Sequence, residues 1–146
     1  MTWPAPQPGL VICYSYLWRR EAEAGQEEGR KDWPCAIILA VAGQGDGARV
    51  IVVPVTHSEP TPPDEGIEIP LATKTRLGLD SGRSWIIVSE ANDFRWPGPD
   101  LRFVPTRGQQ PTVAYGFLPP RLFRAVRDRF VARAQARQAG VVARTE

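Results

Sequence analysis

The sequence predicts a single α+β domain, residues 1–146, in which a small, strongly bent sheet or barrel is followed by a helix near the C-terminus. A chain of 146 residues, 42% of them hydrophobic, can bury one modest core. Its 15 Pro and 13 Gly exclude long uninterrupted helices over most of the length. Short apolar segments bounded by turn residues therefore indicate four to six strands.

The predicted strands are rich in β-branched and aromatic residues. They are residues 9–16, 34–41, 49–56, 67–69, 84–90 and a short last one at 92–96. The charged segment 17–32 cannot bury an apolar face, so we expect a long solvated loop with a turn or two of helix. Residues 43–47 (GQGDG) predict a hairpin loop, because no Lys-Ser/Thr pair follows them as in a phosphate-binding loop.

Two helices complete the predicted domain. Residues 71–78 fit two helical turns closed by Gly78. Residues 121–134 follow two prolines and should pack one apolar face on the sheet. That face consists of Leu122, Phe123, Val126, Phe130 and Ala134.

The remaining segments show no sustained hydrophobic period. We expect residues 97–118 to be loop or extended chain. Both ends of the domain, residues 1–7 and 140–146, are predicted to be flexible.

Composition and cysteine placement favour a cytoplasmic protein without a metal or cofactor. The longest apolar run, residues 35–42, is far shorter than the roughly 20 residues that a membrane span requires. The N-terminus lacks the basic and apolar regions of a secretion signal. Cys13 and Cys35 lie in apolar segments without CxxC spacing, which indicates buried thiols. One His in the whole chain gives almost no support to a zinc site.

Charge is distributed unevenly along the chain. Residues 1–101 carry nine Lys or Arg against fourteen Asp or Glu, whereas residues 102–146 carry nine Arg against two acids. A basic C-terminal part on an acidic body raises the expectation of an anionic partner, either nucleic acid or an acidic protein segment.

The end of the strand predicted at 49–56 carries the most informative polar residues. Thr56, His57 and Ser58 follow a buried run, at a place where a sheet fixes the backbone while the tip meets solvent. Thr56 and Ser58 could instead make ordinary turn hydrogen bonds, with His57 a surface side chain. Nucleophile elbows, HExxH, EF-hands and dinucleotide fingerprints are absent from the sequence.

Short motifs follow one another in a consistent order over residues 8–94. They are PGLVI at 8–12, WPCAIIL at 33–39, VIVVPVTHS at 50–58, IEIP at 67–70 and GLD at 78–80. In these motifs the chain resembles the PemK/MazF family of toxin endoribonucleases. The resemblance implies an SH3-like bent barrel, a homodimer, cleavage of single-stranded RNA without a metal, and inhibition by a proteinaceous antitoxin.

The resemblance also bears on individual residues. Thr56 matches the catalytic Thr of the family. Where the family has a catalytic Arg immediately before the Pro that begins the second strand, this chain has Trp33. His57 separates Thr56 from Ser58, which the family places next to each other.

Metal-free RNA cleavage by the 2′-hydroxyl needs a base, an acid and a positive donor for the phosphorane charge. We assign the phosphoryl contact to Thr56, the cation to Arg30 and proton transfer to His57. The residues expected to bind the RNA around them are Lys31, Trp33, Ser58, Arg19 and Arg20.

Two alternatives stay open. Because Trp33 stands at the Arg position, the chain could be a catalytically degenerate member of the family that binds RNA or an antitoxin-like peptide without cleaving it. It could also be a structural or regulatory domain unrelated to nucleic acid, with Trp33 in the core or in a dimer interface.

Overall fold

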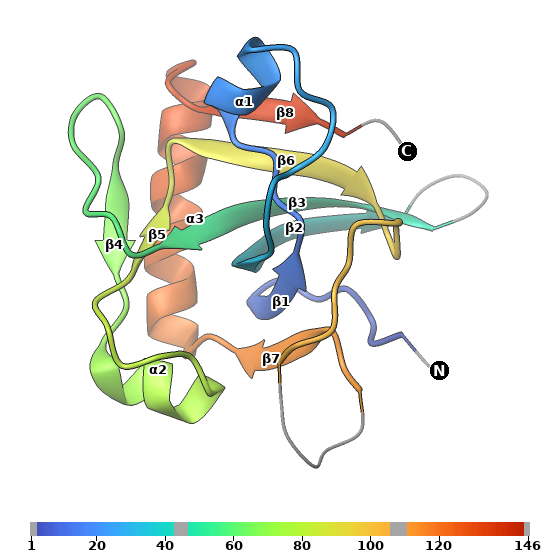
Figure 1. The fold of residues 1–146 in the computed structure, drawn as a ribbon. Coiled ribbons are helices and arrows are strands. Elements are labelled where there is room, and N and C mark those ends of the chain that lie inside the picture. Colours follow the sequence, from blue (N-terminus) through green and yellow to red (C-terminus); the bar gives the residue numbers. More distant parts are fainter. Residues whose placement is uncertain (1–2, 43–46, 106–110, 145–146) are drawn as a thin grey trace.

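A computed structural model describes residues 3–42, 47–105 and 111–144, which form an α+β fold dominated by an antiparallel sheet (Figure 1). The strands are β1 (Leu10–Tyr14), β2 (Trp33–Ala42), β3 (Ala48–Thr56), β4 (Gly66–Glu68), β5 (Trp85–Ile87), β6 (Glu90–Arg95), β7 (Ala114–Phe117) and β8 (Gly140–Ala143). The helices are α1 (Arg19–Glu23), α2 (Leu71–Leu77) and α3 (Pro120–Gln135). The prediction of an α+β fold is confirmed.

β3 is the central strand of the sheet. The strand order is β4-β5-β3-β2-β1-β7, and β6 pairs with β3 and with β8. The first half of β3 pairs with β6 along residues 49–52, whereas its end, Val55 and Thr56, pairs with β5. Among the described residues no pairing joins β4 to β7, so these strands form an open sheet.

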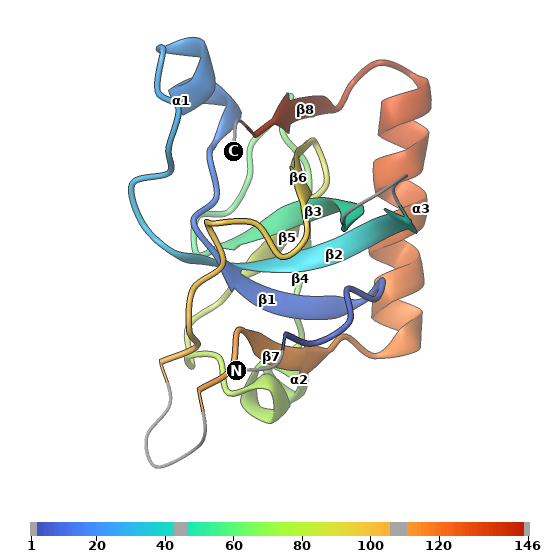
Figure 2. The same cartoon turned by 90° about the vertical axis from the view of Figure 1, so that its right-hand side faces the viewer.

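Apolar side chains are buried on both faces of the sheet. α3 packs against one face (Figure 2), where Val126 and Phe130 join Val11 in one apolar cluster. A second cluster contains Ile12 and Tyr14. Because successive side chains of a strand point to opposite faces, β1 supplies both clusters, and this explains its continuously apolar sequence.

The helices and the central hairpin follow the sequence pattern. α2 ends at Gly78, whose φ of 73° is the left-handed conformation typical of a helix C-terminus. On the predicted face of α3, Val126 and Phe130 are buried, but Ala134 in the last turn is exposed. β2 and β3 pair antiparallel as expected for a hairpin. Of its predicted loop, residues 43–46 lie outside the described residues.

Two strands form where the sequence predicts none. β7 lies within the segment expected to be loop or extended chain and pairs with β1. β8 lies where we expect flexible chain, and it pairs with β6 in a parallel direction. Both strands are short and only half-buried, so their own sequences show little alternation of apolar and polar residues. Pairing with a distant strand determines their structure.

The charged segment 17–32 is mostly loop around the short α1, as predicted. Its first residues, Leu17 and Trp18, are buried, contrary to the solvated loop expected there. The Leu17 backbone N–H donates to Asn92 Oδ1 at 2.9 Å, and Asn92 Nδ2 donates to the Leu17 carbonyl at 2.7 Å. An amide side chain of β6 thus replaces the strand partner that this backbone lacks.

The two cysteines are buried, as the sequence analysis predicts. Cys13 and Cys35 are free and buried, and burial raises the pKa of both thiols. This disfavours the reactive thiolate form. No helix in the described ranges is long and apolar enough to cross a bilayer.

Arg144, directly after β8, anchors the C-terminal segment. Its side chain is fully buried, and Nη1 donates to Tyr14 Oη at 3.1 Å, to the Ser15 carbonyl at 2.7 Å and to Asn92 Oδ1 at 3.1 Å. Nη2 lies 3.0 Å from Asp100 Oδ2. Planar guanidinium groups suit such multiple acceptors, and the network joins β8 to β1, β6 and residue 100.

Replacing Arg144 with Met should lower the free energy of unfolding by about 3 kcal/mol, because the Asp100 carboxylate loses its buried partner. Urea unfolding followed by circular dichroism measures this difference. Arg124→Met, which changes an exposed Arg of α3, is the matched control and should change stability little. Equal stability of the two variants would contradict the anchoring role.

Candidate functional site

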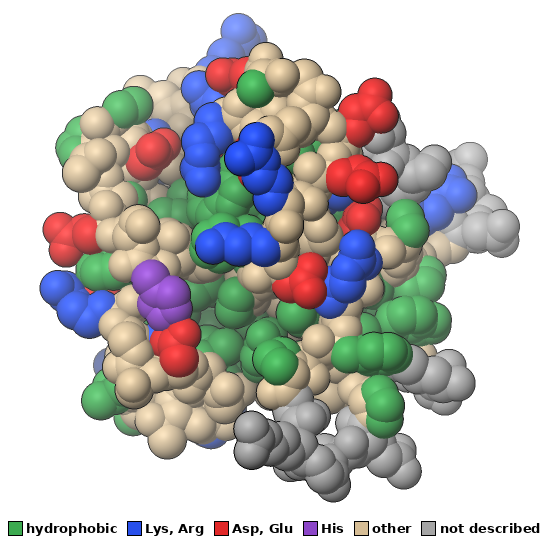
Figure 3. Space-filling model, in the orientation of Figure 1, with side chains coloured by type: hydrophobic (Ala, Val, Ile, Leu, Met, Phe, Trp, Pro, Cys, Tyr) green, Lys and Arg blue, Asp and Glu red, His purple; other side chains and the backbone are tan. Residues whose placement is uncertain are grey.

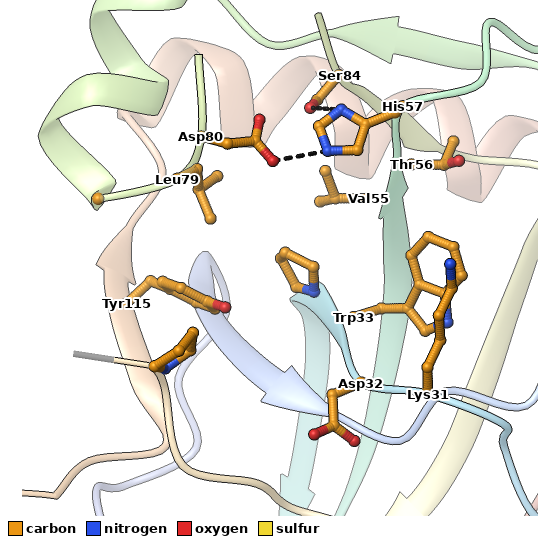
Figure 4. A pocket seen from close by; sticks show the side chains of 13 residues that line it. Lys31, Asp32, Trp33, Val55, Thr56, His57, Leu79, Asp80, Ser84 and Tyr115 are labelled. Carbon is orange, nitrogen blue, oxygen red and sulfur yellow. Dashed lines mark hydrogen bonds and ion pairs between the residues drawn. The ribbon is translucent and has the colours of Figure 1, made fainter. Parts of the chain in front are cut away.

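A cavity of ≈ 470 Å³ opens at the end of β3, and we name it the His57 cavity (Figure 4). It is lined by residues 31–34, 55–57 and 78–80 together with Ser84, Pro105 and Tyr115. Lys31 and Trp33 lie on one side of the cavity, and His57 with Asp80 lies on the other. The cavity therefore contains four of the residues that the sequence analysis assigned to RNA cleavage or binding, namely Lys31, Trp33, Thr56 and His57.

Both ring nitrogens of His57 face oxygen atoms. Nε2 lies 2.7 Å from Asp80 Oδ2. Nδ1 lies 2.9 Å from the Arg83 carbonyl oxygen and 3.3 Å from Ser84 Oγ. The imidazole is therefore held in a fixed orientation at the rim of the cavity although its side chain is 58% exposed.

Lys74 of α2 holds the loop that carries Asp80. Its side chain is buried, and Nζ donates to Asp80 Oδ1 at 2.6 Å, to Ser84 Oγ at 2.7 Å and to the Gly82 carbonyl. Three donors on one ammonium match three acceptors of the 80–84 loop. Lys74 thus orients His57 through Asp80.

The same contacts act on the charge of Asp80. The hydrogen bond from Lys74 holds the pKa of this carboxyl below its usual value, and the neighbouring His57 acts in the same direction. Asp80 is therefore a carboxylate at neutral pH, placed between a buried ammonium and an exposed imidazole.

The Thr56 hydroxyl is accessible at the end of β3. Thr56 is half-buried, and Oγ1 accepts a hydrogen bond from the Ser58 backbone N–H at 3.1 Å. Because that bond occupies an acceptor position of the hydroxyl, its O–H remains able to donate to a ligand. The turn hydrogen bond expected from such a residue and a role in binding are thus compatible.

Lys31 and Trp33 form a cation–π pair beside Thr56. Lys31 Nζ lies 4.3 Å from the centroid of the Trp33 ring, which is only half-buried. A cation on an exposed indole is typical of surfaces that bind single-stranded nucleic acid. The residue immediately before Pro34 is thus an indole whose face carries the ammonium of Lys31.

A second hollow of ≈ 330 Å³, which we name the Glu90 cavity, shares Thr56 and Trp33 with the first. Arg20 and Ser58, which the sequence analysis assigned to RNA binding, both line it. The two cavities therefore lie on either side of Thr56 and Trp33. Figure 3 shows this face, where Lys and Arg side chains gather around a hollow with hydrophobic side chains, and the histidine lies at its other margin.

The structure places two predicted residues outside both cavities. Arg30, assigned as the catalytic cation, hydrogen-bonds Gln26 and lies 3.8 Å from Glu21, with its side chain 74% exposed. Arg19, assigned to RNA binding, pairs with Glu23 at 3.1 Å. Each lies on or next to α1. The sequence predicts a turn or two of helix in segment 17–32 but not its position.

Sequence reasoning missed Asp80, Lys74, Ser84 and Glu90 as parts of the site. One signal was present, because the chain contains only two lysines beside sixteen arginines, and both lie here. An ammonium is a compact point charge, whereas a guanidinium is a broad fork, so a site that keeps Lys in an Arg-rich chain indicates a geometric requirement.

The described residues contain no group of three or more His, Cys, Asp or Glu side chains that could hold a metal ion. Comparison of the chain with protein-family models, with curated proteins and with solved structures finds no match.

Replacing Asp80 with Asn should lower the free energy of unfolding at pH 7, and the difference from wild type should become smaller at acidic pH. The pKa of Asp80 is lowered in the folded protein, so the carboxylate stabilises the fold above the unfolded-state pKa of about 3.9 and loses this effect as pH falls below it. Urea unfolding at pH 7, 5 and 3 measures the difference between the two proteins.

The control for this experiment is Asp128→Asn, which removes an exposed acid of α3. A stability difference between wild type and Asp80→Asn that stays constant down to pH 3 would contradict the role of the ionised carboxylate.

Proposed function

We propose that this chain is an endoribonuclease that cleaves single-stranded RNA without a metal. The observation that carries the proposal is the gathering of Thr56, His57 and Lys31 in one open cavity at the end of a buried strand. These side chains are a hydroxyl, an imidazole and a cation, which are the groups that the chemistry requires.

In the proposed reaction the ribose 2′-oxygen attacks the adjacent phosphorus and loses its proton. The bond from phosphorus to the 5′-oxygen breaks, and that oxygen takes up a proton, which leaves a cyclic phosphate and a free 5′-hydroxyl. Thr56 donates a hydrogen bond to a phosphoryl oxygen, and Lys31 neutralises the developing charge. Lys31 takes the place of Arg30, which lies outside the cavity.

His57 is the proposed proton-transfer group. Asp80 holds Nε2, so Nδ1 is the nitrogen that would exchange its contact with the Arg83 carbonyl for one with the substrate. A carboxylate on one nitrogen of an imidazole fixes the ring and stabilises its protonated form during proton transfer. The exposed position of the ring leaves room for this exchange.

The wider biological role is proposed on the resemblance of residues 8–94 to PemK/MazF toxins. The chain would act as the toxin of a type II toxin–antitoxin system in the cytoplasm and be inhibited by a proteinaceous antitoxin. It would form a homodimer, and its bent sheet would have an SH3-like arrangement. The basic segment after residue 101 would suit an acidic antitoxin segment.

A second candidate function is binding of RNA or of an antitoxin-like peptide without cleavage. The presence of Trp33 at the family's Arg position and the exclusion of Arg30 from the cavity favour it. Loss of one donor to the transition state typically costs about a hundred- to thousandfold in rate. A cavity that lacks its guanidinium could therefore retain affinity and lose turnover.

Purified protein should cut single-stranded RNA in the presence of EDTA, and Thr56→Ala should reduce the rate at least about tenfold because one donor to the phosphoryl oxygen is lost. Gel analysis of a labelled RNA measures the rate. Thr56→Ser keeps the hydroxyl and should retain most of the activity. Intact RNA after prolonged incubation with wild type would contradict the nuclease proposal.

Trp33→Arg separates the two candidate functions. If the chain binds without cleaving, this change should create cleavage in a protein that had none, because it restores a cation at the motif position. Band-shift titration at increasing salt measures binding in parallel, and binding through phosphates should weaken steeply with salt. Strong cleavage by wild type would dismiss the binding-only alternative.

A further inference from the structure

The Glu90 cavity contains a carboxyl group that the proposed cleavage does not use. Glu90 is nine-tenths buried, and its Oε1 accepts hydrogen bonds from Tyr16 Oη at 3.0 Å and from the Arg19 backbone N–H at 2.9 Å. Oε2 accepts no hydrogen bond from the described residues. One oxygen is thus fixed by the fold, and the other is free to accept from a ligand.

Burial raises the pKa of Glu90, although the donors from Arg19 and Tyr16 partly offset this. A buried carboxyl with an unused acceptor is costly for a fold, so it commonly marks a functional site.

Aromatic rings form the walls of the cavity beside this carboxyl. Trp18 and Trp33 both line it and meet edge to face, with centroids 5.3 Å apart and an interplanar angle of 82°. Arg20 lies over the Trp18 ring at 4.8 Å, and Lys31 lies over Trp33. Flexible cations on indole faces can move to phosphates while a base takes their place on the ring.

The polar groups of the cavity select for hydrogen-bond donors. Three carboxylates line it, those of Glu59, Asp64 and Glu90. They attract N–H groups, and they repel the O4 carbonyl oxygen that uracil has at the position of the cytosine amino group. The volume of ≈ 330 Å³ lies at the small end of ligand cavities, about 300–1,000 Å³, and suits one planar group.

We propose that the Glu90 cavity binds one unpaired RNA base with an exocyclic amino group, which donates to Glu90 Oε2 while the ring packs on Trp18 or Trp33. The proposal rests on the proposed RNA-binding function, because Thr56 borders both cavities and would place the scissile phosphate next to this base. It predicts that the enzyme distinguishes cytosine from uracil, which have the same ring size and differ at this group.

The test compares binding of dye-labelled 2′-O-methyl oligocytidine and oligouridine of equal length by fluorescence anisotropy at fixed salt. These strands carry no free 2′-hydroxyl and cannot be cleaved by the proposed reaction. Wild type should bind oligocytidine about tenfold more tightly, as expected for one base-specific hydrogen bond. Equal binding of both strands, or binding of neither, would overturn the proposal.

Glu90→Gln tests the free oxygen alone, because Gln keeps an Oε1 that can accept hydrogen bonds from Tyr16 and Arg19. It replaces only the free oxygen with an amide donor, so the preference for cytosine should fall below about threefold or reverse. Glu28→Gln, an exposed acid of the neighbouring loop, controls for the change in charge and should keep the preference. An unchanged preference in Glu90→Gln would also overturn the proposal.

The binding test and the cleavage assay can fail independently of each other. If the oligonucleotide preference holds but RNA stays intact with wild type, the base-binding site stands and the nuclease function fails. If RNA is cleaved but cytosine and uracil bind equally, the nuclease function stands and the base-binding site fails.

Discussion

Buried polar side chains of β6 hold a segment of backbone that has no strand partner. Residues 15–18 leave β1 and run through the interior, where every unpaired N–H and carbonyl is costly. Asn92 satisfies both backbone groups of Leu17, and Glu90 accepts from the Arg19 N–H. These contacts fix Trp18 between them, so the wall of the Glu90 cavity depends on polar pairing within the core.

Lys74 has a comparable role at the His57 cavity. The 80–84 loop contains no regular structure, and one buried ammonium orders it by contacting a carboxylate, a hydroxyl and a carbonyl. The imidazole at the rim is then positioned by Asp80. In both cavities a buried polar side chain thus positions a residue of the cavity wall or rim, and each such buried side chain is costly for the fold unless it is fully paired.

The sequence predicts the central hairpin, α2, α3 and the placement of Thr56 at a strand end, because local hydrophobic period and turn residues determine them. It does not predict β8 or the role of Glu90, since both depend on pairing between residues far apart in the chain. The sequence also does not predict the position of the Arg30 side chain. Its proximity to Trp33 in sequence favoured a place in the cavity, but contacts with Gln26 and Glu21 direct it elsewhere.

The position of β8 at residues 140–143 affects the order in which the molecule is completed. A ribosome that has made only the first 139 residues carries a nascent chain without the strand that pairs with β6 and without Arg144. Asn92 then lacks one donor, and Asp100 lacks its buried cationic partner. The interior that supports Trp18 is therefore complete only once β8 has paired with β6 and Arg144 has reached Asn92.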